Sequence, residues 1–122
     1  PIPAKGAKAT LLFFWATWCE GCKTMVPMLR DLEKRYAARG LKIYAVTSDE
    51  IPMLRPFLRQ WGARFPFQVA LDVQGRLARK YNISSIPQLI LYDATGAKKL
   101  HISRPSAGFE QRLARQIGAL VR

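Results

Sequence analysis

Two cysteines, Cys19 and Cys22, stand two residues apart in the segment from Trp15 to Lys23, and the 122-residue chain has no others. Two thiols at this spacing can close into a disulfide and open again, so chemistry is expected here. A structural disulfide would close too short a loop to remove much chain entropy. A zinc site would need about two more ligands, and the single histidine, His101, lies far along the chain. A redox pair needs only these two thiols, so neither a metal nor a bound cofactor is expected.

The position of the pair predicts how the two thiols differ. Cys19 is expected at the N-terminus of a helix, where backbone N–H groups and the helix dipole favour negative charge. Because the thiolate is the attacking form of cysteine, this placement predicts that Cys19 attacks disulfides. Cys22 lies one turn further on and is expected to be less exposed. It would then resolve the mixed disulfide that Cys19 forms.

Length and charge limit the classes of protein that fit. The whole chain, 1–122, is expected to form one domain, with residues 1–9 as a mobile lead-in of a chain trimmed from a longer protein. The net charge is +12, from 20 Lys and Arg against 8 Asp and Glu. These dispersed cations are interpreted as a solvated surface. The alternative is that they attract the domain to an anionic membrane surface or to an acidic partner protein. Nucleic acid is not expected as a partner, because no basic stretch is interleaved with aromatic residues.

The hydrophobic pattern predicts strands that alternate with helices. Thr10 to Trp15 is a continuous apolar run, typical of a strand buried on both faces. Ser48 or Asp49 is expected to cap the helix that follows the second strand. The expected elements after the first strand are a helix over 20–38, a strand over 41–47, a helix ending before Gly62, a strand over 67–71, a helix over 75–81, a strand over 88–92, its hairpin partner over 97–102 and a helix over 106–121. This order predicts an α/β domain with a central mixed sheet and helices on both faces.

Three segments resemble thioredoxin-fold oxidoreductases. The segment from Phe14 to Lys23, with Pro27 beyond it, is similar to the active-site segment of that fold. Ser85-Ile86-Pro87-Gln88 is similar to its proline loop. The segment from Asp49 to Asp72 resembles the central insertion of the TlpA/ResA branch, the membrane-tethered thiol-disulfide reductases of bacterial envelopes. The resemblance implies a thioredoxin fold and dithiol-disulfide exchange with client protein disulfides, without a cofactor.

The resemblance also implies the residues that bind the client. Pro87 is expected to follow a cis peptide bond and to lie beside the cysteines. Client backbone would pair with Ile86 as an added strand. Trp18 flanks Cys19 and would form an apolar rim that partners touch, whereas Trp15 is expected in the core.

Two positions depart from the pattern of these relatives. Phe13 stands where thioredoxins commonly carry a buried Asp, and Met25 stands where TlpA/ResA-like reductases often carry a Glu. In those relatives, both carboxylates are credited with proton transfer at the buried cysteine. Because this chain has neither, the sequence does not indicate which group transfers the proton. Glu20 is the remaining carboxylate near the thiols, and its charge is expected to raise the pKa of Cys19 and to favour reduction. The alternative is that Glu20 is a solvated first-turn residue that stabilises the helix.

The resemblance therefore implies an envelope reductase, expected to be a periplasmic monomer that is membrane-anchored in its full-length form. Electrons would come from a membrane reductant protein and pass to oxidised cysteines of clients, including apocytochromes c during cytochrome c maturation. Two alternatives stay open: an oxidase that donates its disulfide to folding proteins, and a binding module that keeps the fold without activity. The redox potential distinguishes an oxidase from a reductase. Catalysis of insulin reduction distinguishes an enzyme from a binding module.

Overall fold

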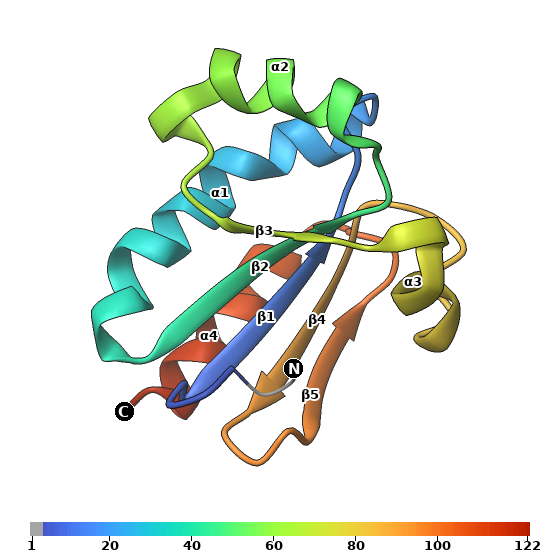
Figure 1. The fold of residues 1–122 in the computed structure, drawn as a ribbon. Helices are drawn as coiled ribbons and strands as arrows, with labels where there is room; N and C mark the ends of the chain where they lie inside the picture. The colour runs from blue at the N-terminus through green and yellow to red at the C-terminus, as the bar shows by residue number, and fades with distance from the viewer. Residues whose placement is uncertain (1–3) are drawn as a thin grey trace.

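The computed structural model describes residues 4–122, and its centre is a five-stranded mixed sheet (Figure 1). The strands are β1 (Ala9–Phe14), β2 (Leu41–Thr47), β3 (Gln68–Leu71), β4 (Gln88–Asp93) and β5 (Lys98–Ile102). Their order across the sheet is β3-β2-β1-β4-β5. The first three strands are parallel, and β4 and β5 run antiparallel to their neighbours. The predicted mixed sheet is confirmed.

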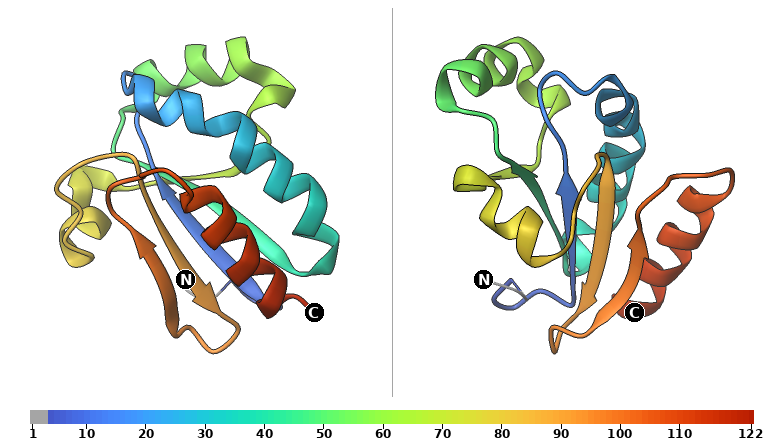
Figure 2. Two further views of the ribbon diagram at one scale, coloured as in Figure 1. Left: turned by 180° about the vertical axis from the view of Figure 1, so that it is seen from behind. Right: turned by 90° about the vertical axis from the view of Figure 1, so that its right-hand side faces the viewer.

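Helices cover both faces of this sheet. They are α1 (Glu20–Tyr36), α2 (Ile51–Trp61), α3 (Arg76–Lys80) and α4 (Phe109–Leu120), with short 3-10 turns at Ala37–Arg39, Gly62–Arg64 and Val73–Gly75. The two views of Figure 2 show α1 and α4 against one face and α3 against the other. None of the helices within residues 4–122 combines the length and the apolar character needed to cross a membrane.

The sheet separates two hydrophobic clusters because side chains alternate along β1. Leu11 and Phe13 belong to the cluster under α1 and α4, and both are fully buried. Leu12 and Phe14 belong to the opposite cluster, where the Phe14 ring meets Tyr81 beyond α3. Burial on both faces explains why β1 is apolar at every position but one.

Several boundaries differ from the sequence prediction. Strand β1 begins at Ala9, one residue early, and α1 ends at Tyr36 before a 3-10 turn. Helix α4 begins at Phe109 rather than at residue 106, because the residue before it, Gly108, takes a left-handed backbone with φ of 86°. The residue that caps α2 is Glu50, so neither Ser48 nor Asp49 caps this helix.

The segment before β1 also differs from the mobile lead-in that the sequence predicted over residues 1–9. Its residues 1–3 lie outside the described part of the chain. Ala4 is buried, and its N–H donates to Thr10 Oγ1 at 3.1 Å. The Ala7 N–H donates back to the Ala4 carbonyl at 3.0 Å, which closes a turn. This segment therefore packs against the start of β1.

The topology gathers loops at one end of the sheet. Strands β1, β2 and β3 all finish there, while α1 and α4 begin there and β4 starts there (Figure 1). Cys19 follows β1 at this end, which we call the thiol end. In a sheet of parallel strands the carboxyl ends are where functional loops converge.

Candidate active site

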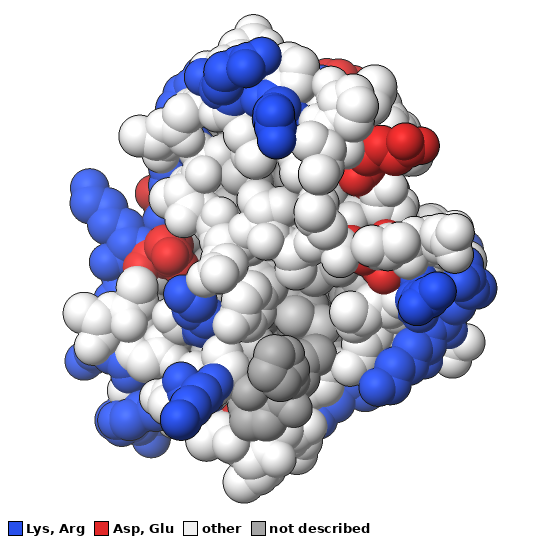
Figure 3. Space-filling model, viewed as in Figure 1, with Lys and Arg blue, Asp and Glu red and all other residues white. Residues whose placement is uncertain are grey.

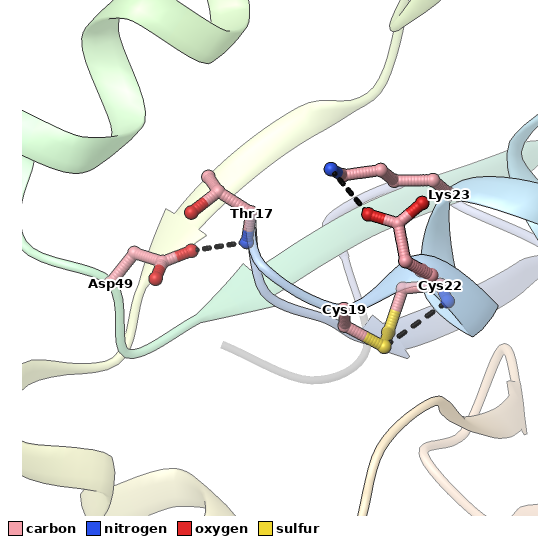
Figure 4. A network of polar contacts seen from close by, with 6 residues as sticks. Thr17, Cys19, Cys22, Lys23 and Asp49 are labelled. Atoms are coloured by element: carbon pink, nitrogen blue, oxygen red, sulfur yellow. Dashed lines mark hydrogen bonds and ion pairs between the residues drawn. A yellow bond between two sulfur atoms is a disulfide. The ribbon is translucent and has the colours of Figure 1, made fainter.

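Cys19 and Cys22 form a disulfide at the junction of β1 and α1, with their Cα atoms 5.3 Å apart (Figure 4). Cys19 caps α1: its Sγ accepts a hydrogen bond from the Cys22 N–H at 3.1 Å. Cys19 is 8% exposed and Cys22 is 1% exposed, so Cys22 is the deeper of the two, as predicted. The helix N-terminus favours negative charge on the outer sulfur, which is the sulfur a partner disulfide can reach.

Glu20 and Lys23 lie on the outer surface of the first turn of α1. The Glu20 Oε2 and Lys23 Nζ atoms are 3.0 Å apart, and the Glu20 side chain is 83% exposed. Water screens an exposed ion pair strongly, and the Lys23 ammonium offsets the Glu20 carboxylate. This geometry supports the alternative in which Glu20 is a solvated first-turn residue of α1.

Asp49 holds the loop that carries Cys19, a role that the sequence did not indicate. Its Oδ2 accepts a hydrogen bond from the Thr17 N–H at 2.7 Å (Figure 4). The same oxygen accepts from the Thr47 hydroxyl at 2.9 Å. These bonds tie the loop between β1 and α1 to the end of β2. They also explain why Asp49 does not cap α2, since its carboxylate is turned toward Thr17. The sequence signal was only a short polar run after the second strand.

Phe13 and Met25, which stand where relatives often carry carboxylates, are buried and apolar. Phe13 and Met25 belong to the same hydrophobic cluster as Cys22. Trp15 is core, as predicted: its ring lies 5.0 Å from that of Phe57 and 4.6 Å from that of Phe65, between centroids. The interior side of the cysteine pair is thus hydrophobic.

The proline loop lies directly against the cysteine pair. The Ile86–Pro87 peptide bond is cis. A Cβ atom added to Gly21, between the cysteines, would lie 3.6 Å from Pro87 Cδ, so the ring and the helix turn are in van der Waals reach. Pro105, in the loop before α4, lines a hollow together with Pro87.

A short chain of hydrogen bonds supports the proline loop from behind. The Gln88 side-chain amide donates to the Ser85 carbonyl at 2.9 Å. Its Oε1 therefore faces His101 Nε2, 2.7 Å away, and that nitrogen donates. Burial, and next the charge of Lys98, hold the pKa of His101 below its usual range, which favours the neutral ring. The chain His101–Gln88–Ser85 fixes the loop that carries Ile86 and Pro87.

Two hollows flank the proline loop. One of about 370 Å³ is lined by Trp18 and Ile86, with apolar residues of β1 and of the segment after α3. The other, of about 360 Å³, lies between Pro87, Gly21 and Pro105. Trp18 is 66% exposed and stands at the rim of the first hollow. The structure thus brings together the cysteines, Trp18, Ile86 and Pro87, whereas Glu20 projects into solvent.

The comparison with known proteins places this site in a family. Residues 3–98 match the model of the AhpC/TSA family. The chain belongs to the AhpC/TSA family. Among the relatives of this AhpC/TSA chain, the thiol-disulfide oxidoreductase ResA of Bacillus thuringiensis is 32% identical over 90 residues, which are 73% of this chain and 51% of the relative. The chain spans about half the length of the curated relatives it matches.

Solved structures confirm the fold of this AhpC/TSA chain. A Chlorobium tepidum protein assigned as a thiol:disulfide interchange protein DsbE is 28% identical with a TM-score of 0.85, over 96% of this chain and 82% of that one. StoA from Bacillus subtilis is 25% identical with a TM-score of 0.75, over 93% and 84% of the two chains. The predicted thioredoxin fold and the resemblance to the TlpA/ResA branch are both confirmed.

Proposed function

We propose that this AhpC/TSA domain is a thiol-disulfide oxidoreductase that reduces protein disulfides, with Cys19 as the nucleophile and Cys22 as the resolving thiol. The observation that carries the proposal is the Cys19 sulfur at the N-terminus of α1, with Pro87 packed against the turn between the two cysteines. A structural disulfide would need neither the helix N-terminus nor the proline loop. The relatives named ResA and DsbE support the same reaction class.

The reaction transfers two electrons to the client in two exchange steps. The Cys19 thiolate attacks a client disulfide, so that a bond between Cys19 and one client sulfur forms while the client S–S bond breaks. The departing client thiolate takes a proton. Cys22 then loses its proton and attacks the Cys19 sulfur, which closes the Cys19–Cys22 disulfide and releases the second client thiolate. A dithiol reductant must reopen this disulfide before the next cycle.

The thiol end offers the surface that a client segment needs. Within residues 4–122 the backbone N–H and carbonyl of Ile86 make no backbone hydrogen bond, so both are free to pair with an extended client segment. Pro87 would bound this segment on one side and Trp18 on the other. Large apolar side chains are also exposed near this end, where they widen the surface for a protein partner: Ile51, Met53, Leu71 and Val73.

The physiological setting is part of the proposal. ResA and DsbE relatives support a role in the bacterial envelope, with the full-length protein anchored in the membrane and the domain working in the periplasm as a monomer. A membrane reductant protein would supply the electrons. Clients would include apocytochromes c, whose cysteines must be reduced during cytochrome c maturation.

Insulin reduction by dithiothreitol tests the reaction. Catalytic amounts of the wild-type protein should accelerate it, and Cys19→Ser should remove the acceleration entirely. Cys22→Ser should instead accumulate a mixed disulfide at Cys19, which mass spectrometry of host extracts can identify. Cys19→Ser is the matched control for this trap and should capture nothing. A wild type without any acceleration would overturn the proposal.

The redox potential tests the direction of the reaction. Equilibration of the Cys19–Cys22 disulfide with glutathione should give a value near that of thioredoxin, about −270 mV. A value near that of the oxidant DsbA, about −120 mV, would identify an oxidase instead. The measurement follows the same cysteine pair, so it separates these outcomes without knowledge of the client.

A further inference from the structure

Cationic side chains gather at the end of the molecule opposite the thiols. The amino ends of β1 and β2 meet the carboxyl end of β4 there, because Ala9 pairs with both Leu41 and Asp93. Helices α1 and α4 end together there, since a Cβ on Gly118 would lie 3.5 Å from the Tyr36 hydroxyl. Eight cationic residues from these segments, from the stretch before β1 and from the start of β5 form what we call the basic end: Lys5, Lys8, Lys34, Arg35, Arg39, Lys42, Lys98 and Lys99.

Few carboxylates oppose these cations. Within the described residues, Glu33 and Asp93 belong to the same segments, and Asp31 lies further up α1. Asp93 Oδ2 is 3.9 Å from Lys99 Nζ, and its Oδ1 accepts from Thr95. Glu33 is partly buried. Seven of the eight cations are exposed and Lys42 is half-buried. Figure 3 shows Lys and Arg gathered along the lower left, where β2 begins and α1 ends in Figure 1.

The basic end also contains a hollow of about 420 Å³. Lys5 and Lys42 line it, together with the backbone at Gly6 and Gly40. Both lysine side chains carry positive charge, and Lys5 is exposed whereas Lys42 is half-buried. A phosphate group would meet complementary charge in this hollow.

We propose that the basic end docks on an anionic phospholipid surface and holds the thiols away from it. The cations come from many segments and are spread over a whole end of the molecule, which suits a flat surface of many phosphates. Among residues 4–122, the exposed large apolar side chains, such as Trp18 and Val73, lie toward the thiol end. The proposed contact is therefore electrostatic. The 17 residues of α1 span about 25 Å between the thiols and the basic end, so the thiols would be held away from the lipid surface.

Vesicle flotation tests this docking, and it does not depend on the redox reaction. The wild-type chain should float with vesicles of equal parts phosphatidylglycerol and phosphatidylcholine, and not with phosphatidylcholine alone. Each basic residue at an anionic surface contributes roughly fivefold to binding. Combining Lys8→Gln, Lys34→Gln, Arg39→Gln and Lys98→Gln should therefore weaken binding about a hundredfold or more.

A control variant that loses the same number of cations elsewhere distinguishes the effect of the basic end from the effect of net charge. Combining Arg55→Gln, Arg59→Gln, Arg76→Gln and Lys80→Gln removes as many exposed cations from α2 and α3 and should weaken binding by less than about tenfold. Equal losses for both sets of variants would overturn the assignment to the basic end. Near-ultraviolet circular dichroism of each variant should match that of the wild type, which shows that the fold is kept.

Two further measurements test the orientation of the bound protein and the identity of its partner. Alkylation of the reduced thiols by iodoacetamide should keep its rate when the protein is bound to vesicles, because Cys19 faces away. A strongly slowed alkylation would overturn the orientation. Binding of duplex DNA that is tighter than vesicle binding at the same salt concentration, and is lost in the basic-end variants, would identify nucleic acid as the partner instead.

Discussion

The thiol end and the basic end of the sheet differ in both charge and apolar exposure. The thiol end carries five of the eight carboxylates of the chain, namely Glu20, Asp49, Glu50, Asp72 and Glu110. It also carries exposed large apolar side chains, such as Trp18. The basic end carries eight cations and few carboxylates. One end is thus suited to protein segments and thiol exchange, and the other to a charged surface.

Part of this contrast follows from helix direction. Helices α1 and α4 both begin at the thiol end, where acidic first-turn residues such as Glu20 and Glu110 complement the helix dipole. Lys34 and Arg35 lie in the last turn of α1, where cations are favoured. The hairpin cations Lys98 and Lys99 have no such helical role. Helix stability therefore does not explain these two cations, nor Lys5, Lys8 and Lys42, which also lie outside the helices.

The largest expected effect on stability comes from Asp49, which ties the loops of the thiol end together. Asp49→Ala removes the acceptor for the Thr17 N–H and the Thr47 hydroxyl. Hydrogen bonds to a charged group contribute about 1.5–3 kcal/mol, so the free energy of unfolding should fall by about 2 kcal/mol. Urea unfolding of the oxidised protein measures this change.

Glu50→Ala is the matched control, because the neighbouring Glu50 is exposed and makes no side-chain hydrogen bond as the cap of α2. Its substitution should cost less than about 0.5 kcal/mol. Equal costs for the two variants would show that charge near the start of α2, and not the tie to Thr17, stabilises this end.

The next effect concerns the contact between Gly21 and the proline loop. Gly21→Val should place branched methyl groups over Pro87 and narrow the hollow beside it. We expect kcat/KM for insulin reduction to fall about tenfold, which corresponds to about 1.4 kcal/mol of lost transition-state binding. Gly21→Ala should stay within about twofold, since a Cβ at 3.6 Å makes an ordinary van der Waals contact. If both variants keep full activity, clients do not bind across Pro87.

The sequence predicted those parts of the site that depend on residues close together in the chain. The apolar run of β1 identified a central strand, and the Cys19–Cys22 spacing identified the redox pair. The bond between Asp49 and Thr17 spans 32 positions, so no local pattern could indicate it. The sequence did not indicate the basic end, because cations such as Lys8 and Lys98 come to the same end of the sheet only when β1 pairs with β4 and β4 pairs with β5.

A smaller effect is expected from Glu20, the charged group nearest to Cys19 in sequence. Because Lys23 pairs with Glu20 and water screens both groups, Glu20→Gln should raise the rate of Cys19 alkylation at neutral pH by less than about threefold. Lys23→Gln is the complementary control and should change the rate in the opposite direction. An increase well above threefold would restore Glu20 as the residue that tunes the thiol.

The smallest effect is a pH dependence that links the two ends of the molecule. His101 supports the proline loop, and its pKa is lowered by burial and by Lys98 of the basic end. The unfolded chain therefore binds a proton more readily than the folded one. The stabilisation is complete above the ordinary histidine pKa of about 6.5 and is lost as the pH falls below it. The free energy of unfolding should decline slightly over this range.

Because the chain has a single histidine, His101→Gln should flatten this decline and leave the titration of the carboxylates at lower pH unchanged. Lys98→Gln should reduce the decline without removing it, since the charge of Lys98 is the second cause of the lowered pKa and burial is the first. Urea unfolding across this pH range measures all three proteins. A wild-type curve as flat as that of His101→Gln would show that burial does not hold the ring neutral.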